Sequence, residues 1–387
     1  MIASETVKGS KMTRTSKNVH EDLHSEQGAI KGGRAHKAKN PVIKVEDLAW
    51  LEFEKPDLDA AEQFAHDFGF VTAGRSSDAL YLRGALAGTQ CVVIRQGAKS
   101  RFIGPAFKAV DTADVRKLAK ETNSQVTELT SPGGGIGVDL VDPSGIPLRV
   151  VAGVAELPEL PLQEKLSFNF TGELNRVNAM QRPPREPARV ERLGHVVLES
   201  TNFNRALDWY QQHLGLIVSD FLYFPGQRQL GPTMAFIRCD RGSTPADHHT
   251  LAMTLGPGRK YIHSAFQVSD LDALAAGGEY LKEQRYKHSW GIGRHIEGSQ
   301  LFDYWRDPDG FLVEHFADGD MFDNTVEPGW AEMAASGLSQ WGPAVTRDFL
   351  EANPSPHFIK HLVSALADRD NEFTAQRLLG LAKVAMR

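Results

Sequence analysis

Several features are scarce in this chain of 387 residues, and each absence excludes a class of protein. Only two cysteines occur, Cys91 and Cys239, which excludes a disulfide scaffold and fits a reducing compartment, so we expect a cytoplasmic protein. No apolar run approaches the roughly 20 residues that span a bilayer. The formal net charge of −6 gives no electrostatic reason to expect nucleic acid or an anionic membrane as a partner.

The beginning of the chain has little apolar character. Residues 1–40 contain eight lysines and arginines against four acidic residues, and they lack the apolar core of a secretory signal. We therefore predict that 1–40 is a flexible N-terminal arm.

The rest of the chain contains one module written twice. Residues 48–52 correspond to residues 193–197, and both are apolar, strand-like segments. Each is followed by a helix pattern that closes on a glycine, over 59–70 and 203–216. Later in each copy, aspartates open a second helix, and an Asp-Pro-x-Gly turn precedes the last strand. Each copy is thus predicted to have a strand, a helix, several strands, and a second unit in the same order.

These correspondences divide the chain into segments. We predict one domain over 41–153 and a second over 188–321, joined by a proline-containing linker, 154–187, on the surface. Residues 322–387 belong to neither copy and form a partly helical extension, with an amphipathic helix expected over 373–386.

Three residues of the second copy form a set of metal-binding side chains. His195, His263 and Glu314 each lie in an apolar, strand-like run. A lone histidine there is more often a hydrogen-bonded core residue, and a glutamate can face solvent. Together, however, two imidazoles and a carboxylate are the ligands of a non-haem iron(II) site with open positions for substrate and oxygen. A metal also supplies the positive charge that a buried glutamate needs.

The first copy provides an internal control. Its residues at the three corresponding positions are Trp50, Gly104 and Arg149, and none of them is a plausible iron ligand. A purely structural role should have left similar residues in both copies. We therefore predict a single metal site, in the second copy.

With these residues the sequence resembles the two-domain type I extradiol ring-cleaving dioxygenases of the vicinal oxygen chelate superfamily. The resemblance covers about 41–321 and is strongest after His195. It implies an α+β fold of two tandem domains, each a pair of βαβββ units in an incomplete barrel, plus the C-terminal extension. It also implies that only the C-terminal domain binds metal, through His195, His263 and Glu314.

Further catalytic residues follow from the resemblance. The family's catalytic histidine lies in a His-x-[Val/Ile/Leu]-Ala run, which matches His249 in His-Thr-Leu-Ala. Its neighbour His248 is the rival, and strand alternation would turn the two side chains to opposite faces. A histidine and a tyrosine between the second and third ligands map onto His295 and Tyr304.

The implied reaction is the cleavage of a catechol ring beside its two hydroxyls, with Fe(II) as cofactor and O2 as co-substrate. Mn(II) accepts the same ligands. Val197, two residues after His195, faces the same side by strand period, and we expect it to line the substrate site. The resemblance also implies a homo-oligomer.

Two other interpretations remain open. A glyoxalase-like enzyme uses a related scaffold with another metal, but such enzymes usually take their ligands from two modules. That interpretation also leaves His249 and Tyr304 unexplained. The second is a non-enzymatic aromatic-binding protein on the same scaffold, as in the bleomycin-binding relatives, which needs no metal-binding residues.

Overall fold

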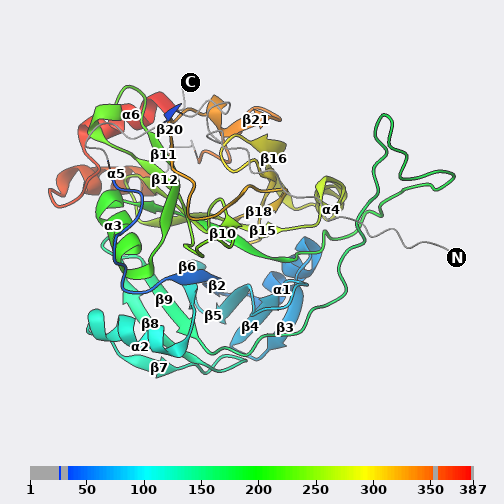
Figure 1. Ribbon diagram of the computed structural model, residues 1–387, viewed down its shortest axis with the longest axis horizontal. Helices are drawn as coiled ribbons and strands as arrows, with labels where there is room; N and C mark the ends of the chain where they lie inside the picture. Colours follow the sequence, from blue (N-terminus) through cyan, green and yellow to red (C-terminus); the bar gives the residue numbers. More distant parts are fainter. Residues whose placement is uncertain (1–25, 28–33, 352–355, 385–387) are drawn as a thin grey trace, which may run out of the picture.

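Two large β-sheets, one from each half of the chain, form the body of the molecule (Figure 1). The structure is a computed structural model that describes residues 26–27, 34–351 and 356–384. Within those residues, no helix is both long and apolar enough to cross a membrane.

The sheet of the first half has the strand order β3-β4-β5-β2-β6-β9-β8-β7. Its two units join where β2 and β6 pair in antiparallel fashion. The elements are β2 (Val45–Lys55), α1 (Leu58–Phe68), β3 (Val71–Arg75), β4 (Ala79–Arg83), β5 (Val92–Gln96), β6 (Arg101–Ala109), α2 (Thr112–Glu121), β7 (Val126–Glu128), β8 (Ile136–Val141) and β9 (Pro147–Ala152).

The sheet of the second half repeats that order as β11-β12-β14-β10-β15-β18-β17-β16. Here β10 and β15 make the antiparallel join. The elements are β10 (Arg192–Ser200), α3 (Phe203–Leu214), β11 (Ile217–Tyr223), η1 (Arg228–Leu230), β12 (Met234–Arg238), β13 (Ala246–Asp247), β14 (Leu251–Leu255), β15 (Lys260–Gln267), α4 (Leu271–Glu283), β16 (Lys287–His295), β17 (Leu301–Arg306) and β18 (Leu312–Ala317). The paired βαβββ units confirm the predicted α+β fold.

Glycines end the first helix of each half, as the sequence pattern predicts. Gly69 and Gly215 adopt the left-handed conformation, with φ of 105° and 68°, which a residue with a side chain rarely adopts. These helices bury Phe68 and Tyr210 in one apolar core that contains residues of both halves.

The C-terminal extension adds strands to the second sheet. β20 pairs with β11, and β21 pairs with β16. The helix predicted over 373–386 is present as Ala375–Val384, and a second helix, at Pro356–Ala367, was not predicted. The elements are β19 (Met321–Phe322), β20 (Gly329–Glu332), η2 (Ser336–Leu338), β21 (Ser339–Trp341), α5 (Pro356–Ala367) and α6 (Ala375–Val384).

The predicted N-terminal arm is described only in part. Its Glu26–Gln27 form the short strand β1, which pairs with β20. Residues 34–40 lie against the second half, where the Arg34 guanidinium donates to Asn204 and Asp208 of α3. The other residues of 1–40 lie outside the described part of the chain.

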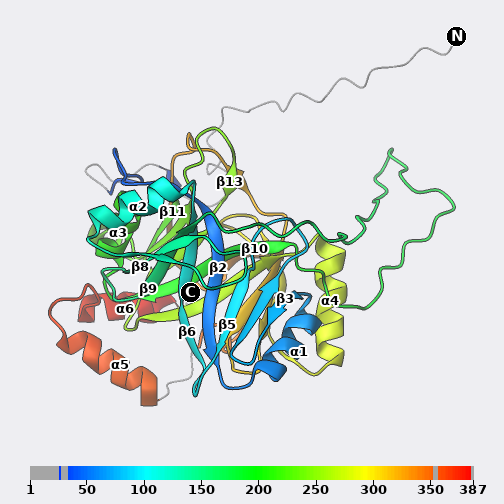
Figure 2. The ribbon, with the colours of Figure 1, turned by 90° about the horizontal axis from the view of Figure 1, so that it is seen from below.

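The connection between the halves, 154–187, does not lie flat on the surface over its whole length. Both views show part of this segment running out from the body (Figure 1, Figure 2). Several apolar side chains on it are exposed, among them Phe170 at 60%, Leu174 at 73% and Met180 at 80%.

Candidate metal centre

The two histidines and the glutamate predicted to bind metal come from three adjacent strands of the second sheet. His195 on β10 is paired with Ala265 on β15, and Ala265 is paired with Glu314 on β18. Paired residues point to the same face of a sheet, and so do residues two apart in a strand. His263, two residues before Ala265, therefore shares a face with both His195 and Glu314.

The three side chains meet at one point. The Nε2 atoms of His195 and His263 lie 3.4 Å apart, and Oε2 of Glu314 lies 3.4 Å from the first and 3.3 Å from the second. Donor atoms about 2.1 Å from one ion and at right angles to each other are separated by about 3 Å. The triangle thus has the size of one face of a metal's coordination shell, and it is the group in the described residues that could hold an ion.

The chemistry of the three donors also fits a cation. Glu314 is fully buried, and within the described chain neither of its carboxylate oxygens has a hydrogen-bond partner. Burial lowers the pKa of His263. Burial acts to raise the pKa of Glu314, but the two imidazoles outweigh it, and that pKa lies below its usual value. A neutral imidazole and an ionised carboxylate are the forms that donate lone pairs to a metal.

His249 lies beside this triangle, and His248 lies beside His249. The imidazole of His249 is 4.0 Å from that of His195, measured between ring centroids. The expected placement of His248 and His249 on opposite faces is wrong, because their Nδ1 atoms are only 3.0 Å apart. Both residues precede β14, which begins at Leu251, so the alternation of a strand does not apply to them.

Tyr304 and His295 form a hydrogen-bonded pair next to Glu314. Tyr304 is the residue opposite Glu314 across β17 and β18. Its hydroxyl lies 2.9 Å from Nε2 of His295, and Nδ1 of His295 donates to the carbonyl of Leu338 at 2.7 Å. Burial holds the pKa of Tyr304 well above its usual value, so the hydroxyl keeps its proton.

The side chains of Val197 and His315 point to opposite faces of the second sheet. Val197 is buried and is paired with His263, so it points to the face that carries the metal-binding residues, as the strand period predicts. The imidazole of His315 turns to the other side, where its Nε2 donates to the carbonyl of Phe68 in the first half.

Sequence reasoning left the role of the C-terminal extension open between a cover over the site and subunit contacts, and it did not identify Phe349. The ring of Phe349 lies 4.8 Å from that of Tyr304 and 6.4 Å from that of His263. The extension thereby covers one side of the site. No motif signals this contact, because it depends on how the extension folds back over the sheet.

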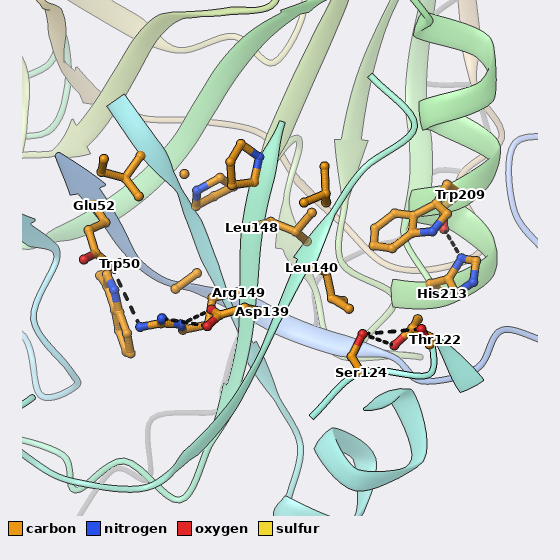
Figure 3. Close-up of a pocket in the computed structure, with 16 residues that line it drawn as sticks. Trp50, Glu52, Thr122, Ser124, Asp139, Leu140, Leu148, Arg149, Trp209 and His213 are labelled. Carbon is orange, nitrogen blue, oxygen red and sulfur yellow. Dashed lines mark hydrogen bonds and ion pairs between the residues drawn. The ribbon is translucent and has the colours of Figure 1, made fainter. Parts of the chain in front are cut away.

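In the first half, the same strand pairing brings together residues that do not bind metal. Trp50 is paired with Ala106 and Ala106 with Arg149, as His195 is paired with Ala265 and Ala265 with Glu314. A cavity of about 710 Å³ lies there, and Figure 3 shows Arg149 between Glu52 and Asp139. The Arg149 guanidinium donates to Asp139, and Glu52 accepts from Arg95. These charges are neutralised within the protein.

The fold and site define a class of protein. It is built from paired βαβββ units and carries a buried group of two histidines and one glutamate in its second half. Residues 192–315 match the family described as the Glyoxalase/Bleomycin resistance protein/Dioxygenase superfamily.

Within that superfamily, the relatives are ring-cleaving dioxygenases by name. Metapyrocatechase 2 of Cupriavidus necator is 29% identical over 317 residues, covering 81% of this chain and 94% of its own. Biphenyl-2,3-diol 1,2-dioxygenase of Paraburkholderia xenovorans (strain LB400) is 22% identical over 322 residues, covering 79% and 97%. The predicted resemblance to the extradiol dioxygenases is confirmed.

Solved structures share the fold. Homoprotocatechuate 2,3-dioxygenase from Brevibacterium fuscum has a TM-score of 0.67 at 17% identity, over 82% of this chain and 95% of its own. A Mn(II)-bound glyoxalase from Novosphingobium aromaticivorans has a TM-score of 0.66 at 24% identity, over 86% and 99%.

Proposed function

We propose that this protein is an extradiol dioxygenase, which uses a divalent metal and O2 to cleave a catechol ring beside its two hydroxyls. The observation that carries the proposal is the buried triangle of His195, His263 and Glu314. The names of the relatives support the same chemistry. Iron(II) is the metal we propose, since this ligand set with open positions is typical of iron(II) oxygenases. The two free, buried cysteines agree with a reducing, cytoplasmic environment.

His195, His263 and Glu314 would hold the metal in a dry part of the sheet. When bound, the metal supplies a Lewis acid that favours the ionised catechol and brings it next to O2. With three protein ligands, the metal would keep open positions for both reactants.

Two groups of this chain are placed to move protons. His249, against the imidazole of His195, is the proposed general acid and base for oxygen-derived atoms. The Tyr304 hydroxyl donates a hydrogen bond to Nε2 of His295, and its oxygen can accept a hydrogen bond from a catechol hydroxyl. A proton leaving the substrate can thus pass through Tyr304 to Nε2 of His295.

Aromatic side chains keep water away from this region. Tyr304 stacks on Trp290, with ring centroids 5.7 Å apart, and Phe349 packs against both. Exclusion of water strengthens the electrostatic interactions inside the site. Together with Val197, these surfaces are the proposed walls around the aromatic ring of the substrate.

The test is a comparison of equivalent positions in the two halves. Glu314→Gln should lose stoichiometric iron and, with it, oxygen uptake with any catechol. Arg149→Gln, at the same register in the first half, should keep both. Metal is measured by elemental analysis after anaerobic iron loading, and turnover by an oxygen electrode over a panel of catechols.

Two results would contradict the proposal. One is full iron content in Glu314→Gln. The other is iron-loaded wild-type protein that binds catechols without consuming O2, which would favour a sequestering protein instead.

We also propose a homo-oligomer. The exposed Phe170, Leu174 and Met180 on the projecting connection supply apolar surface that a second copy could cover. Light scattering on the full chain measures the oligomeric state, and a monomer at all concentrations would refute this part.

A further inference from the structure

A row of three buried side chains leads from β11 to the metal centre. Oδ2 of Asp220 lies 2.6 Å from Nε2 of His248, and Nδ1 of His248 lies 3.0 Å from Nδ1 of His249. Asp220 and His248 are each 1% exposed, and His249 is 4% exposed. The row ends where the imidazole of His249 lies against that of His195.

The identity of the hydrogen-bonding groups fixes where the protons lie. An ionised Asp220 only accepts, so Nε2 of His248 carries a hydrogen. A neutral imidazole then accepts at Nδ1, and Nδ1 of His249 must donate to it. Nε2 of His249 then carries no hydrogen and keeps its lone pair.

A positive charge lies near Asp220. The guanidinium of Arg238 interacts electrostatically with the Asp220 carboxylate and donates to the hydroxyl of Ser219, the residue before Asp220. This guanidinium also interacts with Asp240, Asp323 and Glu327. Glu297 is another acidic group near Asp220, and burial, assisted by the charge of Asp220, raises its pKa to about 8, so at neutral pH Glu297 is mostly protonated.

The middle residue of the row is held firmly. The backbone of His248 donates to the carbonyl of Asp320 and accepts from the hydroxyl of Ser219. Its imidazole packs against the rings of Phe236 and Phe322, each with a centroid 5.4 Å away. These contacts, together with the short hydrogen bond to Asp220, hold the orientation of its two nitrogens.

The first half, which has no metal-binding residues, also lacks the row. Register places Gly74 where the second half has Asp220, since Gly74 and Asp220 each follow the same irregularity in strand pairing. Thr89 and Gln90 precede the strand that corresponds to β14, in the places of His248 and His249. The first half therefore forms the same fold without the row, whereas in the second half the row lies beside the proposed metal-binding residues.

We propose that Asp220 and His248 are positioning residues, which fix the ring of His249 in the tautomer with Nε2 unprotonated and available to the reactants. The expected effect on kcat rests on the proposed function. The tautomer of His249 can be tested without any turnover. In this arrangement His249 starts as a base at Nε2. When it takes up a proton there, His248 and Asp220 stabilise the positive charge through the same hydrogen bonds.

The direct test is the tautomer of His249. Full-length protein with ¹⁵N-labelled histidine, loaded with diamagnetic Zn(II), is examined by NMR, with the His249 signals identified by their loss in His249→Gln. The expected result is a hydrogen on Nδ1 and none on Nε2. A hydrogen on Nε2 in the wild-type protein would overturn the proposal, whatever the activity of the enzyme.

The second test is Asp220→Asn, which removes the charge and keeps the size. We expect full iron content, a KM for catechol within about twofold of wild type, and a kcat lower by roughly 10–100-fold. The His249 spectrum should change with it. The control is Thr89→Ser at the place of His248 in the first half, which should leave kcat unchanged.

Each outcome of the second test has a definite meaning. Unchanged kcat and tautomer in Asp220→Asn, or loss of iron from it, would show that Asp220 serves the fold instead. If Asp220→Asn does not fold, the wild-type spectrum decides alone. An Nδ1-protonated His249 in a protein that consumes no O2 with any catechol would refute the proposed function and leave the positioning intact.

Discussion

At the scale of single residues, the two halves carry chemically different side chains at one equivalent position of the strand pairing. Glu314 and Arg149 are each paired with an alanine of a central strand, Ala265 and Ala106. The carboxylate of Glu314 has no hydrogen bond in the described chain, whereas Arg149 donates to Asp139. An uncompensated buried carboxylate is costly, so the choice of residues on an otherwise repeated scaffold accounts for the proposed metal site.

The hydroxyl of Tyr304 can be tested alone, because its ring also packs. Tyr304→Phe removes the hydroxyl that lies 2.9 Å from His295 and keeps the ring contacts with Trp290 and Phe349. We expect full iron content and a kcat lower by roughly 10²-fold, since one proton-transfer or hydrogen-bonding group is lost. Steady-state oxygen uptake measures it, and a wild-type kcat would remove Tyr304 from the proposed proton route.

At the scale of elements, the sequence predicted the repeated order of strands and helices because each copy carries its own turn and cap signals. Gly69 and Gly215 are such signals, and both lie where the helices end. The relation of His248 to His249 was mispredicted because local pattern does not show where β14 begins. The place of Phe349 over the site was not predictable either, because it depends on long-range packing of the extension.

Asp348 fastens this extension to the second sheet. Its carboxylate accepts from Ser289 of β16 and Arg306 of β17, and it pairs with Lys287. The neighbouring Phe349 covers the metal centre, so the attachment of Asp348 links the extension to the site.

The attachment should depend on pH. Burial acts to raise the pKa of Asp348, but Lys287, Ser289 and Arg306 outweigh it and hold that pKa at about 2. An unfolded aspartate has a pKa of about 3.9. Because the folded pKa is the lower one, the stabilisation is complete above about pH 4 and is lost as the pH falls toward 2.

Asp348→Asn tests this dependence. At pH 7 the variant should have a lower free energy of unfolding than wild type and a higher KM for catechol, because the cover over the site is loosened. The difference in unfolding free energy should shrink as the pH is lowered below about 4. Urea titrations across this pH range measure it, and a difference independent of pH would contradict the role of the charge.

At the scale of the whole molecule, the two halves share an apolar core and are joined by buried ionic contacts of Lys55. Phe53 of the first half packs against Tyr261 and Phe311 of the second, with ring centroids 5.5 and 5.0 Å away. Lys55 pairs with Asp307, and both side chains are 5% exposed. The sequence indicated only a turn at Asp307, because the partner lies in the other copy and no local pattern connects them.

Lys55→Met should therefore destabilise the entire protein and not only the half that contains it. Removing one partner of a buried ion pair costs about 3–5 kcal/mol, since the other charge stays buried without compensation. Here Asp309 lies 3.1 Å from the same ammonium, so the variant would leave two carboxylates close together. We expect a single unfolding transition, seen at one urea concentration by tryptophan fluorescence and by circular dichroism.

Two matched variants isolate the buried pair as the cause. Arg101 pairs with Glu54 in the same half, but its side chain is 63% exposed, so Arg101→Met should change stability far less than Lys55→Met does. Adding Asp307→Asn to Lys55→Met removes the uncompensated charge, while the side-chain oxygen still accepts from the backbone of Phe311. The double variant should therefore recover most of the lost stability. If Lys55→Met were no more destabilised than Arg101→Met, or unfolded in two separate steps, the halves would be independent bodies, and metal binding in the second could not stabilise the first.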